Sequence, residues 1–110
     1  MLDTTTATQI ITDKLTRNGD AIHIVALRRA QGGEIKPVYK ALRKEIKADQ
    51  PADQPAYTLT LPDWFKDELA ETISEFVTAE ERNPQYGIFK DSFNDQPAEW
   101  LTAAMNEFFA

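Results

Sequence analysis

The sequence predicts a small α+β domain that is predominantly helical, with about five helices and one or two short strands. Apolar residues recur every three to four positions along most of the chain, which is typical of helices that bury one face. The stretch 57–61 instead alternates apolar and polar residues, and the apolar stretch near 86–90 is predicted as a second short strand. A chain of 110 residues, 42% hydrophobic and 27% charged, has the size and composition of one soluble domain.

Two helices are expected before the glycine pair at 32–33. Residues 4–6 can supply the N-cap of the first, and Asn18-Gly19 is suited to end it. Asp20 can cap the second, over 21–31, which is apolar nearly all round until it reaches two arginines. Its isoleucines and valine would also suit a strand, but we favour a buried helix.

The helix predicted over 35–48 has two distinct faces. Pro37 is tolerated because it falls in the first turn, where no intrahelical donor is lost. The apolar side consists of Ile35, Val38, Leu42 and Ile46, with Tyr39 at its margin. The opposite side is cationic and consists of Lys36, Lys40, Arg43, Lys44 and Lys47. One face is therefore expected in the core and the other in solvent.

A duplicated Ala-Asp-Gln-Pro at 48–55 separates two unlike lobes of one predicted domain. Residues 1–48 form the basic lobe, 49–56 a linker, and 57–110 an acidic lobe that contains ten of the eleven aromatic residues. In the second lobe we expect a helix over 62–80 and another beginning at Pro97, each with an aromatic and aliphatic buried stripe.

The charge changes sign at the same boundary. Residues 14–47 hold nine Lys or Arg against three Asp or Glu, whereas residues 48–110 hold three against thirteen. The net charge of the whole chain is -6. A basic surface and an acidic surface recognise opposite partners, so this division is the main indication of function.

Residues 20–46 resemble the helix-turn-helix of winged-helix and related DNA-binding regulators. The resemblance lies in Leu27, Gly32, Val38 and Ala41, which occupy the apolar, turn-glycine, apolar and small positions of that motif. Arg28 stands where the motif has a small residue, and Gly33 adds a second glycine. The resemblance implies that the helix at 35–48 enters the major groove of DNA.

The leading interpretation is therefore a small, non-enzymatic regulatory protein that binds duplex DNA. Its predicted contacts are Lys36, Lys40, Arg43, Lys44 and Lys47, which would mostly neutralise phosphates. One helix rarely suffices for DNA recognition, so this interpretation also expects a homodimer formed through 57–110. The alternative is that this cationic face binds no partner and is the solvated side of an ordinary amphipathic helix.

The alternative function is an acidic adaptor or inhibitor that binds a basic protein, in the manner of small inhibitors from phages and mobile elements that imitate nucleic acid. Its predicted contacts lie on the 63–80 helix and are Trp64, Asp67, Glu68, Glu71 and Glu75. Glu80 and Glu81 lie beyond this face. In a third possibility the acidic helix pairs with the basic face and holds it closed.

Catalysis, a cofactor and a metal are not expected. The chain has no cysteine, and its one histidine, His23, lies in the most apolar segment without an identifiable acid partner. Asp91 and Asp95 lack the remaining ligands of a calcium loop. The N-terminus has neither a basic start nor an apolar stretch, so a cytoplasmic location without membrane association is expected.

Overall fold

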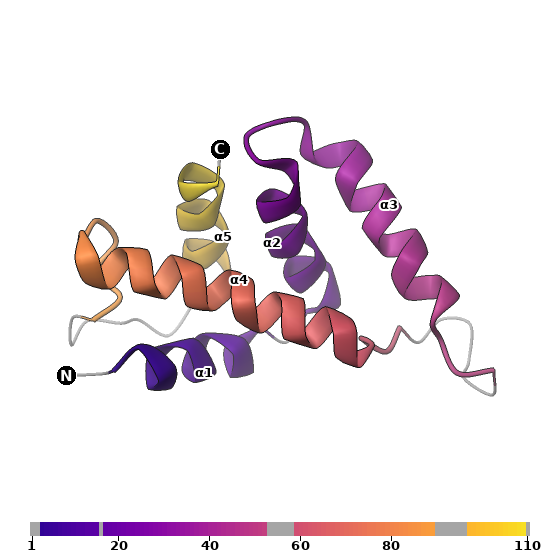
Figure 1. Cartoon of the computed structure of the whole chain (residues 1–110), viewed down its shortest axis with the longest axis horizontal. Helices are drawn as coiled ribbons and strands as arrows, with labels where there is room; N and C mark the ends of the chain where they lie inside the picture. Colours follow the sequence, from indigo (N-terminus) through magenta and orange to yellow (C-terminus); the bar gives the residue numbers. More distant parts are fainter. Residues whose placement is uncertain (1–2, 16, 53–58, 90–96, 110) are drawn as a thin grey trace.

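The computed structural model describes residues 3–15, 17–52, 59–89 and 97–109, and these form a bundle of five α-helices (Figure 1). The helices are α1 (Thr4–Lys14), α2 (Asn18–Ala30), α3 (Ile35–Ala48), α4 (Asp63–Arg82) and α5 (Pro97–Phe108). No strand occurs among the described residues. The five predicted helices are confirmed, and the helix predicted over 35–48 has the predicted bounds. The predicted α+β class is wrong.

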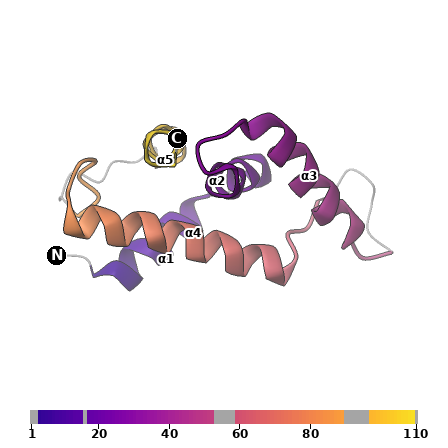
Figure 2. The same cartoon turned by 45° about the horizontal axis from the view of Figure 1, so that its top comes forward.

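The longest helix, α4, runs across the molecule, and the other helices are arranged around it (Figures 1 and 2). α1 packs against α4, and α2 and α5 pack against each other on the same bundle. α3 lies outside α2, towards the end of the molecule opposite the C-terminal end of α4. Because α3 has α2 as its main neighbour, most of its surface remains open.

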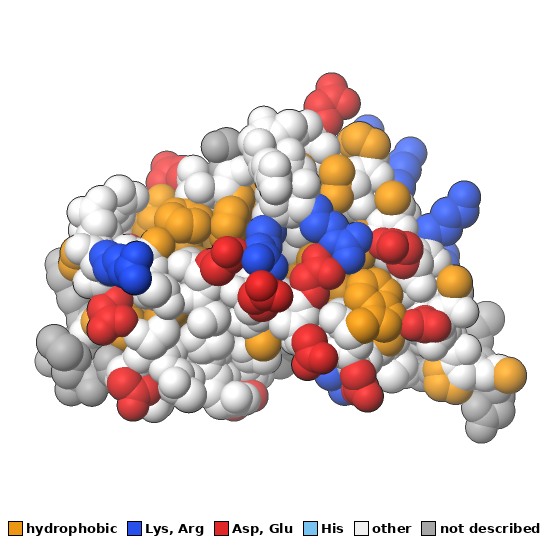
Figure 3. Space-filling view, viewed as in Figure 1, with side chains coloured by type: hydrophobic (Ala, Val, Ile, Leu, Met, Phe, Trp, Pro, Cys, Tyr) orange, Lys and Arg blue, Asp and Glu red, His pale blue; other side chains and the backbone are white. Residues whose placement is uncertain are grey.

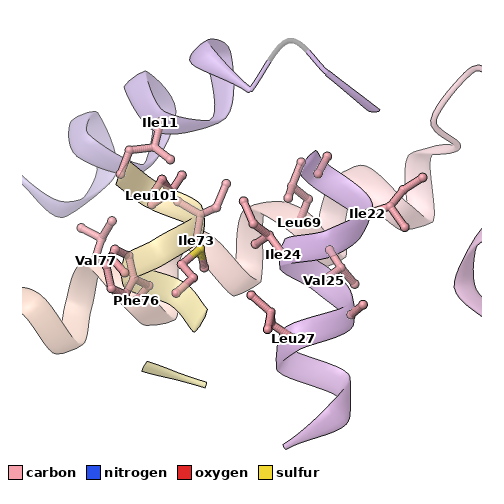
Figure 4. Close-up of a cluster of buried hydrophobic side chains, with 14 of the residues drawn as sticks. Ile11, Ile22, Ile24, Val25, Leu27, Leu69, Ile73, Phe76, Val77 and Leu101 are labelled. Atoms are coloured by element: carbon pink, nitrogen blue, oxygen red, sulfur yellow. The ribbon is translucent and has the colours of Figure 1, made fainter. Parts of the chain in front are cut away.

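All five helices contribute to one hydrophobic core, and Figure 4 shows the part of it that α1, α2, α4 and α5 form. Isoleucine, leucine and valine side chains of α2 face those of α4, and Ile11 from α1 and Leu101 from α5 close the cluster. Helices from both predicted lobes therefore bury their apolar faces together. Of the linker predicted at 49–56, residues 53–56 lie outside the described residues.

The first two helices differ from prediction at the boundary between them. Asp3, rather than a threonine at 4–6, caps α1 by accepting a hydrogen bond from the backbone N–H of Thr6 at 2.7 Å. Asn18 and Gly19 begin α2 instead of ending α1. The Asn18 side chain donates to the carbonyl oxygen of Leu59 at 2.6 Å and so connects α2 to the segment before α4.

The strand predicted near 57–61 is absent from its described part, 59–61. The alternation itself is real, because Leu59 and Leu61 pack against the core while Thr60 is exposed. The backbone N–H and C=O of Thr60, however, bond to the Gln50 side chain at 2.8 and 2.7 Å. The Gln50 side chain thus makes the hydrogen bonds that a neighbouring strand would make. Because no neighbouring strand among the described residues is paired with 59–61, this extended segment forms no sheet.

The strand predicted near 86–90 is also absent from its described part, where 86–89 form a bend and a turn. Gly87 has a φ of 73°, which breaks an extended conformation. The N–H groups of Tyr86 and Gly87 donate to a side-chain carboxylate of α4 rather than to another strand. Ile88 is fully buried, which explains its apolar character.

Among the residues that the structure describes, no helix is long and apolar enough to cross a membrane.

Candidate nucleic-acid interface

The outer side of α3 carries all five cations that the sequence predicts as nucleic-acid contacts. Leu42 and Ile46 are fully buried against α2, and this fixes the rotation of the helix about its axis. The opposite side then faces solvent. We call it the α3 basic face, and its exposed side chains are Lys36, Lys40, Arg43, Lys44 and Lys47.

The long side chains of the α3 basic face leave a shallow depression between them, lined by Lys40, Ala41, Arg43, Lys44 and Lys47. Ala41 has the smallest side chain among them and leaves the space between the longer basic ones. In Figure 3, Lys and Arg side chains project from the edge of the molecule where α3 lies. The shape and charge of this surface suit a narrow polyanion such as a phosphodiester backbone.

No ion pair joins the α3 basic face to any residue within 3–15, 17–52, 59–89 and 97–109. The one acidic residue of α3, Glu45, pairs instead with Arg29 of α2, whose Nη1 lies 2.9 Å from the Glu45 carboxylate. The positive charge of the α3 basic face is therefore not neutralised within the described part of the protein.

The acidic side of α4 differs from the α3 basic face because several of its carboxylates form ion pairs with arginines of α2. Arg29 binds Glu68 through two parallel hydrogen bonds, from Nε at 2.6 Å and from Nη2 at 2.7 Å. This pairing raises the pKa of Arg29 above its ordinary value. The hydrogen bonds from Arg29 lower the pKa of Glu68 below its ordinary value of 4.5, although partial burial of the carboxyl acts in the opposite direction.

The preceding arginine, Arg28, contacts two carboxylates, which lie one and two turns further along α4. Nε of Arg28 lies 2.6 Å from the Glu75 carboxylate, and Nη2 lies 3.2 Å from that of Glu71. Partial burial alone would lower the pKa of Arg28, but the two carboxylates outweigh it and raise the pKa. Figure 3 shows the resulting mixture of acidic and basic side chains in the middle of that face.

Trp64, the predicted centre of a protein-binding surface, is partly buried where α3 ends and α4 begins. Its Nε1–H donates to the carboxylate of Asp49 at 2.6 Å, and the guanidinium of Arg29 lies 6.0 Å from its ring centroid. The indole therefore joins α3, α2 and α4. Of the four acidic residues predicted beside it, Asp67 alone is exposed without an ion pair to any described residue.

Glu80 is buried, with 3% of its surface exposed, and does not extend the acidic surface as its sequence position suggested. Its carboxylate accepts backbone hydrogen bonds from Gln85, Tyr86 and Gly87 at 2.7 to 3.0 Å. These bonds hold the turn after α4 against the end of that helix. The role of Glu80 is structural, because its oxygens are occupied by the backbone of this turn.

The connection between α2 and α3 contains the glycine position of the helix-turn-helix resemblance, which itself stays a prediction. Residues 31–34 join them, with Gln31 at a φ of 49° and Gly32 at a φ of 85° in the left-handed region. Leu27 is buried and Val38 is partly buried, while Ala41 lies exposed on the α3 basic face. The glycine of the motif thus occupies a turn position that favours glycine.

The sequence does not predict that Arg28 and Arg29 pair with three carboxylates of α4. In the sequence they stand at the polar end of an apolar helix, and these partners lie about 40 residues further along the chain. A signal was present in the spacing of Glu68, Glu71 and Glu75, which places three carboxylates on one side of α4. Which cations they would meet depends on how α2 packs on α4.

Comparison with protein-family models, with curated proteins and with solved structures found no match for this chain. Within the described residues there is also no group of three His, Cys, Asp or Glu side chains that could hold a metal ion. The candidate site therefore depends on the geometry and charge of α2, α3 and α4.

The pairing of Glu68 predicts a specific dependence of stability on pH. Because the pKa of Glu68 is lower in the folded state, its contribution is fully present above about pH 4.5 and is lost as the pH falls through the folded-state pKa. We expect Glu68→Gln to lower the free energy of unfolding at pH 7 by about 1 kcal/mol. The difference between wild type and variant should shrink as the pH is lowered from 5 towards 3 in urea denaturation.

Asp67→Asn is the matched control, since Asp67 is the exposed neighbour without an ion pair to a described residue. It should change the free energy of unfolding by less than about 0.5 kcal/mol. A Glu68→Gln difference that stays constant from pH 7 to pH 3 would contradict the pairing as the source of the effect.

Proposed function

We propose that the protein is a small, non-enzymatic regulator that binds duplex DNA through the α3 basic face. One observation carries the proposal: five exposed cations share one side of a helix, and none of them is paired with a described residue. Five phosphate contacts would make the affinity strongly dependent on salt. A cytoplasmic location forms part of the same proposal.

The state of the acidic residues supports this choice. A protein with a net charge of -6 repels polyanions at long range, so its carboxylates weaken DNA binding unless other groups neutralise them. Arg28 and Arg29 pair with three carboxylates of α4 and with Glu45 of α3. The two arginines offset two of these four negative charges, while the five cations of the α3 basic face have no ion pair with a described residue.

The alternative function, a surface on α4 that captures a basic protein, receives less support. A basic partner would compete with Arg28 and Arg29 for Glu68, Glu71 and Glu75, and Trp64 already donates its N–H to Asp49. The proposal in which α4 holds the basic face closed is also weakened, because the carboxylates of α4 bind arginines of α2 instead. We therefore propose DNA as the partner.

The experiment that tests this function is a fluorescence anisotropy titration of a random-sequence duplex with the full chain. We expect binding at about 50 mM salt and a log–log slope of roughly -4 to -5 between affinity and salt concentration. Absence of binding at about 50 mM salt would refute the proposed function.

A further inference from the structure

A second surface lies on the other part of α4, away from α3. The C-terminal half of α4 and the end of α5 border a shallow groove that includes Thr78, Ala79, Phe108 and Phe109. Phe108 is 39% exposed and is the one large hydrophobic side chain with such exposure among the described residues. Its ring lies edge-on to that of Phe109, with centroids 4.8 Å apart. We call this surface the α4–α5 groove.

Oppositely charged side chains stand at the two ends of this groove. Glu71 lies at one end of its α4 side and Arg82 at the other. They are separated by about three helical turns, or ~16 Å, and so lie on the same side of α4. Arg82 is exposed and has no ion pair with a described residue, while 65% of the Glu71 side chain is exposed. Arg28 contacts one oxygen of Glu71 at 3.2 Å, so the other carboxylate oxygen of Glu71 can accept an arginine of a partner while this contact is kept.

Two copies of α4 that run in opposite directions bring these unlike charges together. A two-fold axis between two antiparallel copies of α4 would place Glu71 of each protomer opposite Arg82 of its partner. Between these two pairs, Glu75 of each protomer would lie near Thr78 of the partner, and its charge is already paired with Arg28 at 2.6 Å. The small side chains of Ser74 and Ala79 flank this stripe. The exposed ring of Phe108 would be covered at the edge of the same contact, which removes apolar surface from water.

We propose that the α4–α5 groove is the surface through which two copies of this chain associate. The occupant is a second copy because one stripe carries both members of the charge pair in the order that a two-fold contact requires. The contact does not depend on the proposed function. α3 lies at the opposite end of the molecule, so association would leave both basic faces exposed (Figure 1).

The test is sedimentation equilibrium of the full chain from about 5 to 500 μM, a range that covers weak and moderate homodimers. We expect the average mass to rise from 12.5 kDa towards twice that value. Arg82→Glu and Glu71→Lys should each weaken association at least 10-fold, because each creates two repulsive pairs. An equimolar mixture of the two variants should regain association, because both pairs become attractive in the heterodimer.

Lys66→Glu and Asp67→Lys are the matched controls, since both reverse an exposed charge of α4 outside the groove. They should associate as the wild type does. Glu71→Lys leaves the 2.6 Å contact between Arg28 and Glu75 in place, and circular dichroism checks its fold. A constant mass of 12.5 kDa for the wild type would overturn the proposal, as would a mixture that associates no better than each variant alone.

Discussion

Replacing Lys40 and Arg43 by glutamate should weaken the binding of duplex DNA about 100-fold at low salt. Both side chains line the depression on the α3 basic face, so the double variant removes two phosphate contacts and adds two repulsive charges. The log–log slope with salt should also fall in magnitude by about two. Both positions are exposed, so the core contacts of Leu42 and Ile46 are retained.

The matched control is Arg17→Glu with Lys66→Glu, which changes the net charge by the same amount at two exposed positions outside α3. It should reduce the affinity for the same duplex by less than about 3-fold at about 150 mM salt, where distant charges are screened. Equal losses in the two double variants would show that net charge, rather than the α3 basic face, determines binding.

Glu80→Ala is expected to destabilise the protein by about 3 kcal/mol. The carboxylate of Glu80 accepts hydrogen bonds from three successive backbone N–H groups, of Gln85, Tyr86 and Gly87. The substitution leaves these donors without their acceptor and releases the turn that places Ile88 in the core. Thermal denaturation should show a midpoint lower by roughly 10 °C.

Two further variants separate the hydrogen bonds from the charge. Glu80→Gln keeps one acceptor oxygen and should lose about half as much stability as Glu80→Ala. Glu81→Ala removes an adjacent, exposed carboxylate and should cost less than about 1 kcal/mol. Glu81 accepts one side-chain hydrogen bond, from Thr4, so equal midpoints for Glu80→Ala and Glu81→Ala would show that the three backbone contacts of Glu80 contribute no more than that single bond.

The helices could be predicted because their signals are local. In α3 the glycine turn before the helix and the Ala-Asp-Gln-Pro repeat after it predicted the bounds, and the spacing of Leu42 and Ile46 predicted the side that faces the core. The alternation at 59–61 also identified which side chains are turned inwards. It did not identify a strand, because a strand requires a partner, and Gln50 and Asn18 satisfy this backbone instead.

Local sequence pattern could not predict which charged side chains are ion-paired or buried. The same helical periodicity that grouped Glu68, Glu71 and Glu75 says nothing of the arginines that approach them from α2. Glu80 belongs to the same acidic run and is nevertheless buried, because the turn at 85–87 folds back onto it. The charge pattern predicted where the two charged faces lie. The packing of α2 on α4 decides that the acidic side of α4 is ion-paired, whereas the α3 basic face is not paired with a described residue.

The most direct test of this account is to map where the DNA binds. In a ¹⁵N-labelled sample of the full chain titrated with a short duplex at low salt, we predict that the shifted amide resonances concentrate between Lys36 and Lys47 of α3. Resonances of α4 near Glu71 and Glu75 should remain nearly unchanged, because these two carboxylates share the one cation Arg28 and their remaining negative charge repels phosphate. Shifts concentrated on α4, with α3 unaffected, would contradict the central claim that the unpaired cations of α3 form the binding surface.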